Sequence, residues 1–206
     1  MQKPTEIFGK WAEEGKDVGM EKGHATSVKD MLNFALQERA NIGKNFSFLD
    51  LGCGNGWVAR NVSKNSLCAK AVGIDGAEQM IINAKKNGGQ VDYILADINS
   101  YTSPMRFDLI HSMEVLYYLD DPASKIKTLC DHWLEEQGRL IIGIDHYYEN
   151  LDSHSWEEKV GTPMLMLKEA EWLDIFNESG LGDIKSWRSN ESKDWAGTLI
   201  LTGIKN

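Results

Sequence analysis

The sequence predicts a three-layer α/β/α sandwich built on a mainly parallel sheet of seven strands. Segments with the patterns of strands and helices alternate through most of the 206 residues, which is typical of a parallel sheet covered by helices on both faces. Two further strand-like runs stand near the C-terminal end with no helix between them. The 42% hydrophobic content suffices for a full core at this length, so we expect one domain over residues 1–206.

The first predicted strand, residues 46–51, is a short apolar run of the kind that is buried on both faces in a parallel sheet. It leads directly into a turn over residues 52–56 with glycine at every second position, and a helix is predicted over residues 58–64. Glycines permit a tight turn and a close approach of the backbone to a ligand, and a side chain at Gly54 should collide with that ligand. This strand, turn and helix predict a small-molecule site at the carboxyl end of the first strand.

The elements that follow keep the same alternation. Further strands are predicted over residues 71–75, 93–96, 107–112 and 139–145, and further helices over residues 77–87, 122–135 and 168–179, the last closed by Gly180. Before the first strand, the pattern predicts an amphipathic helix over residues 25–40. The polar, glycine-bearing residues 20–24 before it have the composition of a mobile lid or of a solvated loop.

The C-terminal end departs from this alternation. Residues 183–188 and 198–204 read as two strands, and the polar residues 189–194 between them are too few for a crossover helix. We therefore expect the two strands to pair as an antiparallel hairpin.

The charge and the hydropathy of the chain exclude several classes of function. A formal net charge of −9 argues against nucleic acid as a substrate, since binding to a phosphate backbone depends on clustered lysine and arginine. No run approaches the roughly 18 to 20 apolar residues that span a bilayer, and the first residues lack the apolar core of a signal peptide. We expect a cytoplasmic protein without a membrane partner.

The cysteines do not point to a metal or redox centre. Cys53, Cys68 and Cys130 are odd in number and widely spaced, with no close pair. They are expected to be reduced thiols that pack or line the site, and no metal ion is expected.

A carboxylate at the end of the second strand is the next marker of a ligand. Asp75 lies about 20 residues beyond the glycine turn, where an acidic side chain can accept hydrogen bonds from ribose hydroxyls. The same carboxylate could instead cap the helix that starts near Ala77.

The segment Asp50-Leu-Gly-Cys-Gly-Asn-Gly resembles the first motif of class I S-adenosylmethionine (SAM) dependent methyltransferases, including the acidic residue two before the first glycine. The dinucleotide fingerprint would need a third glycine at position 57, where this chain has Trp57. The resemblance covers most of residues 46–145 and implies a Rossmann-like fold, in which the C-terminal hairpin places the last strand antiparallel between the fifth and sixth strands.

In this family, a carboxylate after the third strand accepts from the adenine amine, and Asp97 matches that position, with the backbone N–H of Ile98 beside it. Met80 matches a position that often packs on the adenine face, although methionine is more often simply part of the core. The resemblance implies that SAM and its product S-adenosylhomocysteine (SAH) contact a set of residues spread over the first four strands and the N-terminal segment: Trp11, Asp50, Gly52, Cys53, Gly54, Asp75, Gly76, Met80, Asp97, Ile98 and His111.

The family has no universal catalytic residue to carry over, so candidates are chosen by position and chemistry. We take His111, Tyr117 and His146, which lie at the carboxyl ends of the fourth and fifth strands, as the catalytic candidates. His111 is the best general base by type, because an imidazole titrates near neutrality, but it could equally orient the loop or pack against the cofactor. The N-terminal segment offers His24 as a further possible contact.

The acceptor is only partly constrained. Many small-molecule members carry Glu-His where this chain has Tyr117-Tyr118, which weighs against a quinone-type acceptor, and the motif of base methylation is absent. Tyrosines beside carboxylates, as at Tyr147 and Tyr148, could hold a cationic amine, although an ordinary packed lid explains them as well.

We therefore predict an enzyme that transfers a methyl group from SAM to a small-molecule acceptor. Its parts are an N-terminal lid and helix (1–42), a cofactor-binding core (43–145), a substrate-side insertion (146–167) and a C-terminal helix and hairpin (168–206). A non-catalytic SAM or SAH sensor and an aminopropyltransferase-like enzyme remain alternatives, and an NAD-dependent enzyme is a distant fourth. The oligomeric state is left open.

Overall fold

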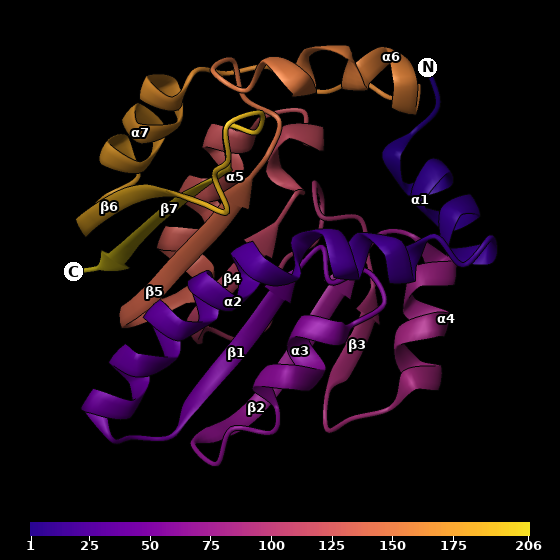
Figure 1. Cartoon of the computed structure of the whole chain (residues 1–206). Coiled ribbons are helices and arrows are strands. Elements are labelled where there is room, and N and C mark those ends of the chain that lie inside the picture. The colour runs from indigo at the N-terminus through magenta and orange to yellow at the C-terminus, as the bar shows by residue number, and fades with distance from the viewer.

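The computed structural model describes residues 1–206 and confirms the predicted fold class. Seven strands form one sheet in the order β3-β2-β1-β4-β5-β7-β6 (Figure 1). Strands β1 to β5 are parallel, and β7 lies antiparallel between β5 and β6. The strands are β1 (Phe46–Leu51), β2 (Cys68–Asp75), β3 (Asp92–Leu95), β4 (Phe107–Met113), β5 (Leu134–Ile144), β6 (Leu181–Ser189) and β7 (Thr198–Lys205).

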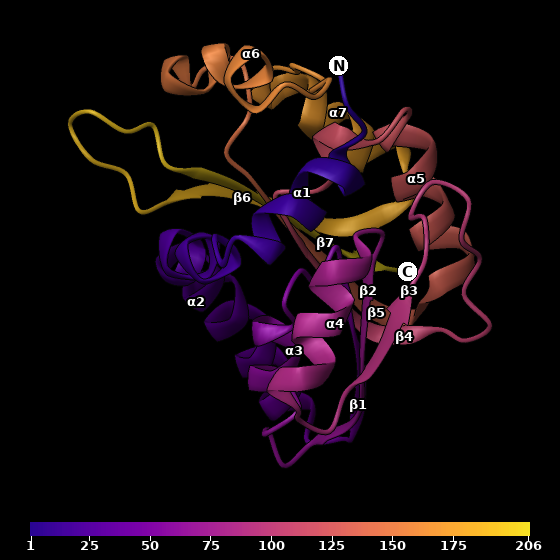
Figure 2. The ribbon, with the colours of Figure 1, turned by 90° about the vertical axis from the view of Figure 1, so that its right-hand side faces the viewer.

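Helices cover both faces of the sheet. Figure 2 shows α2, α3 and α4 on one side and α5 and α7 on the other. The helices are α1 (Pro4–Glu13), α2 (Asp17–Ile42), α3 (Trp57–Val62), α4 (Glu78–Asn87), α5 (Pro122–Thr128), α6 (Trp156–Val160) and α7 (Glu169–Glu178). None of them combines the length and the apolar character that a bilayer span requires.

Alternating side chains of the buried strands serve two separate cores. In β1, Phe48 packs with Met31 of α2 and Val58 of α3, whereas Leu49 packs with residues of the opposite face such as Ile126 of α5. This period-2 alternation is what a strand buried on both faces requires, and it explains why β1 reads as a continuous apolar run.

The predicted helix over residues 122–135 was wrong at its C-terminal end. Helix α5 ends at Thr128, a π-helical turn covers Leu129–Trp133, and β5 begins at Leu134, five residues before its predicted start. Leu134 pairs with Phe107 of β4, so tertiary pairing extends the strand through a polar stretch that the sequence pattern assigns to a helix and a loop.

The N-terminal region is more helical than expected. The helix predicted over residues 25–40 lies inside α2, which spans Asp17–Ile42 and ends at Gly43 in the left-handed conformation. Residues 20–24, expected to form a loop, belong to this helix. A separate helix, α1, precedes α2 and packs beside α4 (Figure 1).

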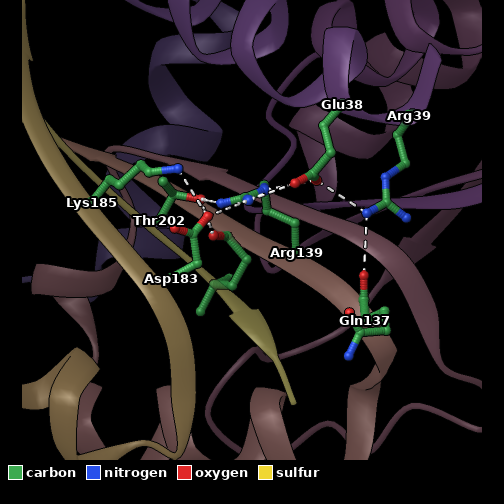
Figure 3. Close-up of polar contacts among 8 residues, drawn as sticks. Glu38, Arg39, Gln137, Arg139, Asp183, Lys185 and Thr202 are labelled. Carbon is green, nitrogen blue, oxygen red and sulfur yellow. Dashed lines mark hydrogen bonds and ion pairs between the residues drawn. The ribbon is translucent and has the colours of Figure 1, made fainter. Parts of the chain in front are cut away.

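An ion-pair cluster joins the C-terminal end of α2 to the three strands β5, β7 and β6 (Figure 3). Arg139 of β5 is 1% exposed and donates to Glu38 at 2.8 and 2.6 Å and to Thr202 Oγ1 at 2.9 Å. Arg39 donates to the carbonyl of Gln137 at 3.2 Å. Asp183 and Lys185 of β6 complete this group, which we call the Arg139 cluster.

Within the Arg139 cluster, burial works against the charge of Glu38, but its hydrogen bonds with Arg139 and Arg39 outweigh that effect. They hold the pKa of the Glu38 carboxyl below its usual value. Each carboxylate of the Arg139 cluster is thus paired with a basic side chain.

Candidate functional site

A cavity of about 550 Å³ opens at the carboxyl ends of the parallel strands, on the side covered by α1 and the first turns of α2. This is the crevice in which open α/β sheets bind ligands. The residues that line it come from α1, α2, the glycine turn and the ends of β2, β3 and β4: Lys3, Pro4, Thr5, Phe8, Asp17, Met20, Glu21, His24, Asp50, Gly52, Cys53, Gly54, Asn55, Trp57, Val58, Asp75, Gly76, Ala77, Met80, Asp97, Ile98, Asn99, His111, Met113, Glu114, Val115, Tyr118, Leu119 and Asp120.

The three glycines of the turn have different reasons to be glycine. All three have positive φ, but a Cβ on Gly52 would collide with Val115 and one on Gly56 with Tyr93. At Gly54, with φ +51°, the nearest atom to an added Cβ is the sulfur of Met80 at 3.8 Å. Packing therefore forbids a side chain at the outer two positions, whereas the space over Gly54 belongs to the cavity.

Asp75 is held at the end of β2 by the backbone of two neighbouring turns. Its Oδ2 accepts from the N–H of Gly54 at 2.8 Å and its Oδ1 from the N–H of Ala77 at 2.8 Å. The bond to Ala77 ends at the N-cap residue of α4 and not in its first turn, so Asp75 joins the glycine turn to the start of α4 without capping the helix. Burial raises the pKa of Asp75 despite these hydrogen bonds.

A buried pair lies between the glycine turn and β4. Asp50 Oδ1 and His111 Nδ1 are 2.8 Å apart, with both residues almost fully buried. The other atoms of the pair, Asp50 Oδ2 and His111 Nε2, have no protein partner. Since buried polar atoms normally find partners, these two mark a place where a ligand can bind.

Asp97, Ile98 and Met80 line the β3 side of the cavity together. Asp97 Oδ1 accepts from the N–H of Asn99 at 2.9 Å, which fixes the carboxylate beside the cavity. Met80 also packs with Ala12 and Ala77, so it belongs to a small core as well as to the cavity wall.

A second group of polar side chains gathers past the ends of β4 and β5. Glu114 accepts from the backbone N–H of Asp145 and from Tyr117 Oη at 2.7 Å. Asp145 Oδ2 is 3.6 Å from Nδ1 of His24 on α2. Burial and the nearby charge of Asp145 raise the pKa of Glu114 well above its usual value.

Three candidates from the sequence lie outside the cavity lining. Trp11 packs edge-on against Phe8, which does line the cavity. Tyr117 is 2% exposed and stands behind Glu114. His146 is buried, with Nδ1 3.2 Å from the carbonyl of Ser153, and burial lowers its pKa.

Sequence reasoning missed several lining residues on the N-terminal side. Thr5 contacts Gly76 so closely that a Cβ there would lie 2.7 Å from the Thr5 methyl. Asp17 accepts from Nδ2 of Asn55 at 3.2 Å and of Asn83 at 3.3 Å, which ties the start of α2 to the glycine turn and to α4. Two sequence signals favoured a helix there: Pro4 at its first position and the apolar residues Ile7, Phe8, Trp11 and Ala12 at helical spacing.

Comparisons with known proteins agree with this geometry. The family model described as "Methyltransferase domain" matches residues 49–152. A ubiquinone biosynthesis O-methyltransferase of Serratia proteamaculans is 32% identical over 117 residues, which are 54% of this chain and 47% of that protein. The chain spans about half the length of the curated relatives it matches first.

Solved structures share the fold over nearly the whole chain. A methyltransferase in a complex with the Haloferax volcanii Trm112 methyltransferase activator is 23% identical, with a TM-score of 0.82 and coverage of 99% of this chain and 98% of that one. Magnesium protoporphyrin IX methyltransferase from Synechocystis PCC 6803, with bound SAH, is 19% identical, with a TM-score of 0.69 and coverage of 89% and 84%.

Proposed function

Because this chain belongs to the class I SAM-dependent methyltransferase family, whose cofactor is SAM, we propose that it transfers a methyl group from SAM to a small-molecule acceptor and releases SAH. SAM supplies a methyl carbon already activated by a sulfonium leaving group. The protein then has to bind both molecules, align them and exclude water.

The observation that carries this proposal is the difference among the three glycines of the turn. Gly52 and Gly56 are explained by packing, whereas Gly54 faces open cavity and needs no glycine for packing. Its φ of +51° favours glycine by itself, and a ligand that lies against the Gly54 backbone would give a second reason for the absence of a side chain.

The other cavity residues fit the parts of SAM. We propose that Asp50 Oδ2, which has no partner in the protein, faces the ammonium group of the methionine end, with His111 beside it. We assign Asp75 to the ribose, because each of its oxygens keeps a lone pair beyond its backbone hydrogen bond. Asp97, the backbone of Ile98 and the side chain of Met80 would hold the adenine.

Helix α1 covers the cavity, and its contacts favour a small acceptor. Phe8 of α1 packs against Tyr118, with ring centroids 5.2 Å apart. The backbone N–H of Gln2 donates to the carbonyl of Gly161 at 3.0 Å, which ties the start of α1 to the end of α6. We propose that α1 acts as a lid that keeps water from the reaction, as the N-terminal part of a single-domain enzyme over residues 1–206.

The test is calorimetric binding of SAM, SAH and NADH to the wild-type protein and to two glycine variants. Gly54→Val should abolish SAM and SAH binding. Gly180→Val is the matched control, because Gly180 also has positive φ, at +87°, and free space around it, but lies outside the cavity. Binding of SAM to a folded Gly54→Val protein, or a wild-type preference for NADH, would contradict the proposal.

Turnover separates an enzyme from a sensor. A sensor would bind SAM and SAH but leave no label on any compound of a metabolite pool supplied with methyl-labelled SAM. We also propose a cytoplasmic location, and that any protein partner, such as the activator in the solved complex named above, modulates the chain without completing its cavity. Co-expression with and without such an activator, followed by SAM binding, tests this last point.

A further inference from the structure

The cavity is unusually one-sided in charge. Its lining holds seven carboxylates: Asp17, Glu21, Asp50, Asp75, Asp97, Glu114 and Asp120. Lys3 is its one lysine, and no arginine lines it. An acceptor with a carboxylate or phosphate group would meet this charge without a counter-ion, whereas an acceptor with a positive charge would be attracted.

Three of these carboxylates are assigned to SAM in the proposed function, and Glu114 stands apart from them, after β4. Its φ is +59°, a conformation that a residue other than glycine keeps only when its surroundings hold it. The hydrogen bonds from the Asp145 backbone and from Tyr117 fix the carboxylate at the wall of the cavity. The site thus maintains a buried carboxylate with no positive side chain bonded to it.

Asp145 adds a second, incompletely paired carboxylate behind Glu114. It is 5% exposed, and its Oδ1 has no hydrogen-bond partner in the protein. Its backbone carbonyl accepts from Asn150 Nδ2 at 2.7 Å, so the residue is held in place from both sides. Its Oδ2 faces Nδ1 of His24 at 3.6 Å.

His24 therefore has the arrangement of an oriented base. The contact with Asp145 is on Nδ1, which leaves Nε2 for the cavity that His24 lines. At 3.6 Å this contact is longer than a hydrogen bond, and it would tighten to orient the imidazole when an acceptor is bound. His111 also has a carboxylate on Nδ1 and a free Nε2, but its partner Asp50 is the residue assigned above to the methionine end of SAM, and His146 lies outside the lining.

We propose that the methyl acceptor is an amine, which enters the cavity as its ammonium ion with Glu114 as counter-ion and gives its proton to the His24–Asp145 pair. Tyr118, Phe8 and Trp57 line the same cavity and offer aromatic rings to a cation. This inference rests on the proposed methyl transfer and names the class of its acceptor.

Atoms and electrons balance in this step. One proton leaves the ammonium nitrogen for Nε2 of His24 and frees a lone pair on nitrogen. That lone pair forms a bond to the methyl carbon while the carbon–sulfur bond breaks, and its electron pair stays on sulfur. The sulfonium becomes a neutral thioether, the product leaves as a methylated ammonium ion, and the proton on His24 passes to solvent.

The test sorts candidate acceptors by their charge, so the identity of the acceptor need not be known. A small-molecule extract is separated by ion exchange at pH 7 into cationic, neutral and anionic pools, and each is incubated with the full chain and methyl-labelled SAM. The expected result is label in the cationic pool alone. Label confined to the neutral or anionic pool overturns the amine assignment, while no label in any pool overturns the proposed methyl transfer itself.

Two variants then test the assigned roles, using the labelled cationic pool. Glu114→Gln should lower the labelling rate about tenfold or more, the loss expected for one buried charge-assisted hydrogen bond. The control is Glu178→Gln, on an exposed carboxylate of α7. Labelling by a folded, SAM-binding Glu114→Gln protein at the wild-type rate would overturn the counter-ion role.

His24→Gln should lower the rate about a hundredfold near pH 7 with SAM affinity unchanged, and the deficit should shrink as pH rises, because more amine is then already deprotonated. His132→Gln, on an exposed histidine outside the cavity, is the control. Asp145, which follows β5, is the ionisable group in contact with His24, and Glu114 after β4, Tyr118 and, on its own helix, Glu21 line the same cavity. A deficit that is constant with pH would overturn the role of His24 as base.

Discussion

The same two elements, α2 and β5, make two polar clusters of opposite character. At the C-terminal end of α2, Arg139 of β5 meets Glu38 in the Arg139 cluster. Near the start of α2, His24 faces Asp145, which follows the end of β5 and lies beside Glu114. In the first cluster each carboxylate is paired with a basic side chain, whereas the second leaves a carboxylate oxygen without a partner.

The carboxyl pKa values express this difference. Hydrogen bonds with arginines lower the pKa of Glu38 against the effect of burial, whereas burial and a like charge raise the pKa of Glu114. Glu38 is paired with basic side chains, which indicates a structural role, whereas Glu114 accepts hydrogen bonds only from neutral donors, which leaves its charge for a ligand to match. A polar cluster that stabilises the fold thus pairs its carboxylates with basic side chains. A cluster that binds a ligand leaves a carboxylate without such a partner.

The largest expected effect on stability is in the Arg139 cluster. Arg139→Ala should lower the free energy of unfolding by about 3 kcal/mol, because it leaves the partly buried Glu38 without its bidentate partner. Urea denaturation measures this. SAM affinity of the remaining folded protein should stay unchanged, and a loss of SAM binding in parallel would mean that the two ends of α2 are not independent.

On the ligand side, Asp75→Ala should weaken SAM binding by about 2 kcal/mol through lost charge-assisted hydrogen bonds to the ribose. Calorimetry measures this, with Asp92→Ala on the exposed neighbouring strand β3 as control. Unchanged affinity in a folded Asp75→Ala protein would reduce Asp75 to a cap of the turn.

The contribution of Glu114 to stability should change with pH in the opposite sense to the contribution of Glu38. The Glu114 carboxyl ionises near 4.5 in the unfolded chain and at a higher pH in the folded one, so the folded chain holds an extra proton between the two values. Stability falls as pH rises through this interval. Glu114→Gln removes the carboxyl whose ionisation lowers stability. Without a ligand, the variant should therefore be more stable than wild type at neutral pH by about 1 kcal/mol.

Glu38→Gln is the matched comparison. The pKa of Glu38 is lowered by folding, so its contribution is present above 4.5 and disappears as pH falls through the folded-state value. The variant should be less stable than wild type at neutral pH and equal to it in acid. Thermal melts from pH 3 to 8 check both variants, and parallel curves would refute the contrast.

The smallest effect is expected at the rim of the Arg139 cluster. Lys185 bonds Asp183 at 2.9 Å, and the side chains of both residues are about half exposed. Lys185→Ala should change the free energy of unfolding by no more than about 0.5 kcal/mol, since solvent screens such pairs. A larger loss in urea would show that the cluster is cooperative out to its exposed edge.

The sequence was most informative where chemistry and local structure coincide. The strand ending at Leu51, the glycine turn and Asp75 lie close in sequence and have strong local patterns, so their meeting at one edge of the sheet followed from the fold. The antiparallel C-terminal hairpin was predicted for a similar reason, because its linker is short.

The rest depended on tertiary contacts that no local pattern reveals. His24 and Asp145 are far apart along the chain and meet only because α2 packs over β5. Glu114 takes a left-handed conformation that the residues next to it in the sequence do not predict. Tyr117 and His146 had the right chemistry at strand ends, but Tyr117 lies in a short helical turn and bonds Glu114 from behind, and His146 is buried beside the carbonyl of Ser153.

The contacts of α1 also bear on how fast the protein can work. Thr5 rests on Gly76, Phe8 rests on Tyr118, and Gln2 is bonded to Gly161, so under the proposed function the donor and the product pass through an opening that α1 covers. Each catalytic cycle then includes the breaking and re-forming of these contacts. Solvent viscosity, which slows such movements and leaves bond making untouched, would set the pace of turnover.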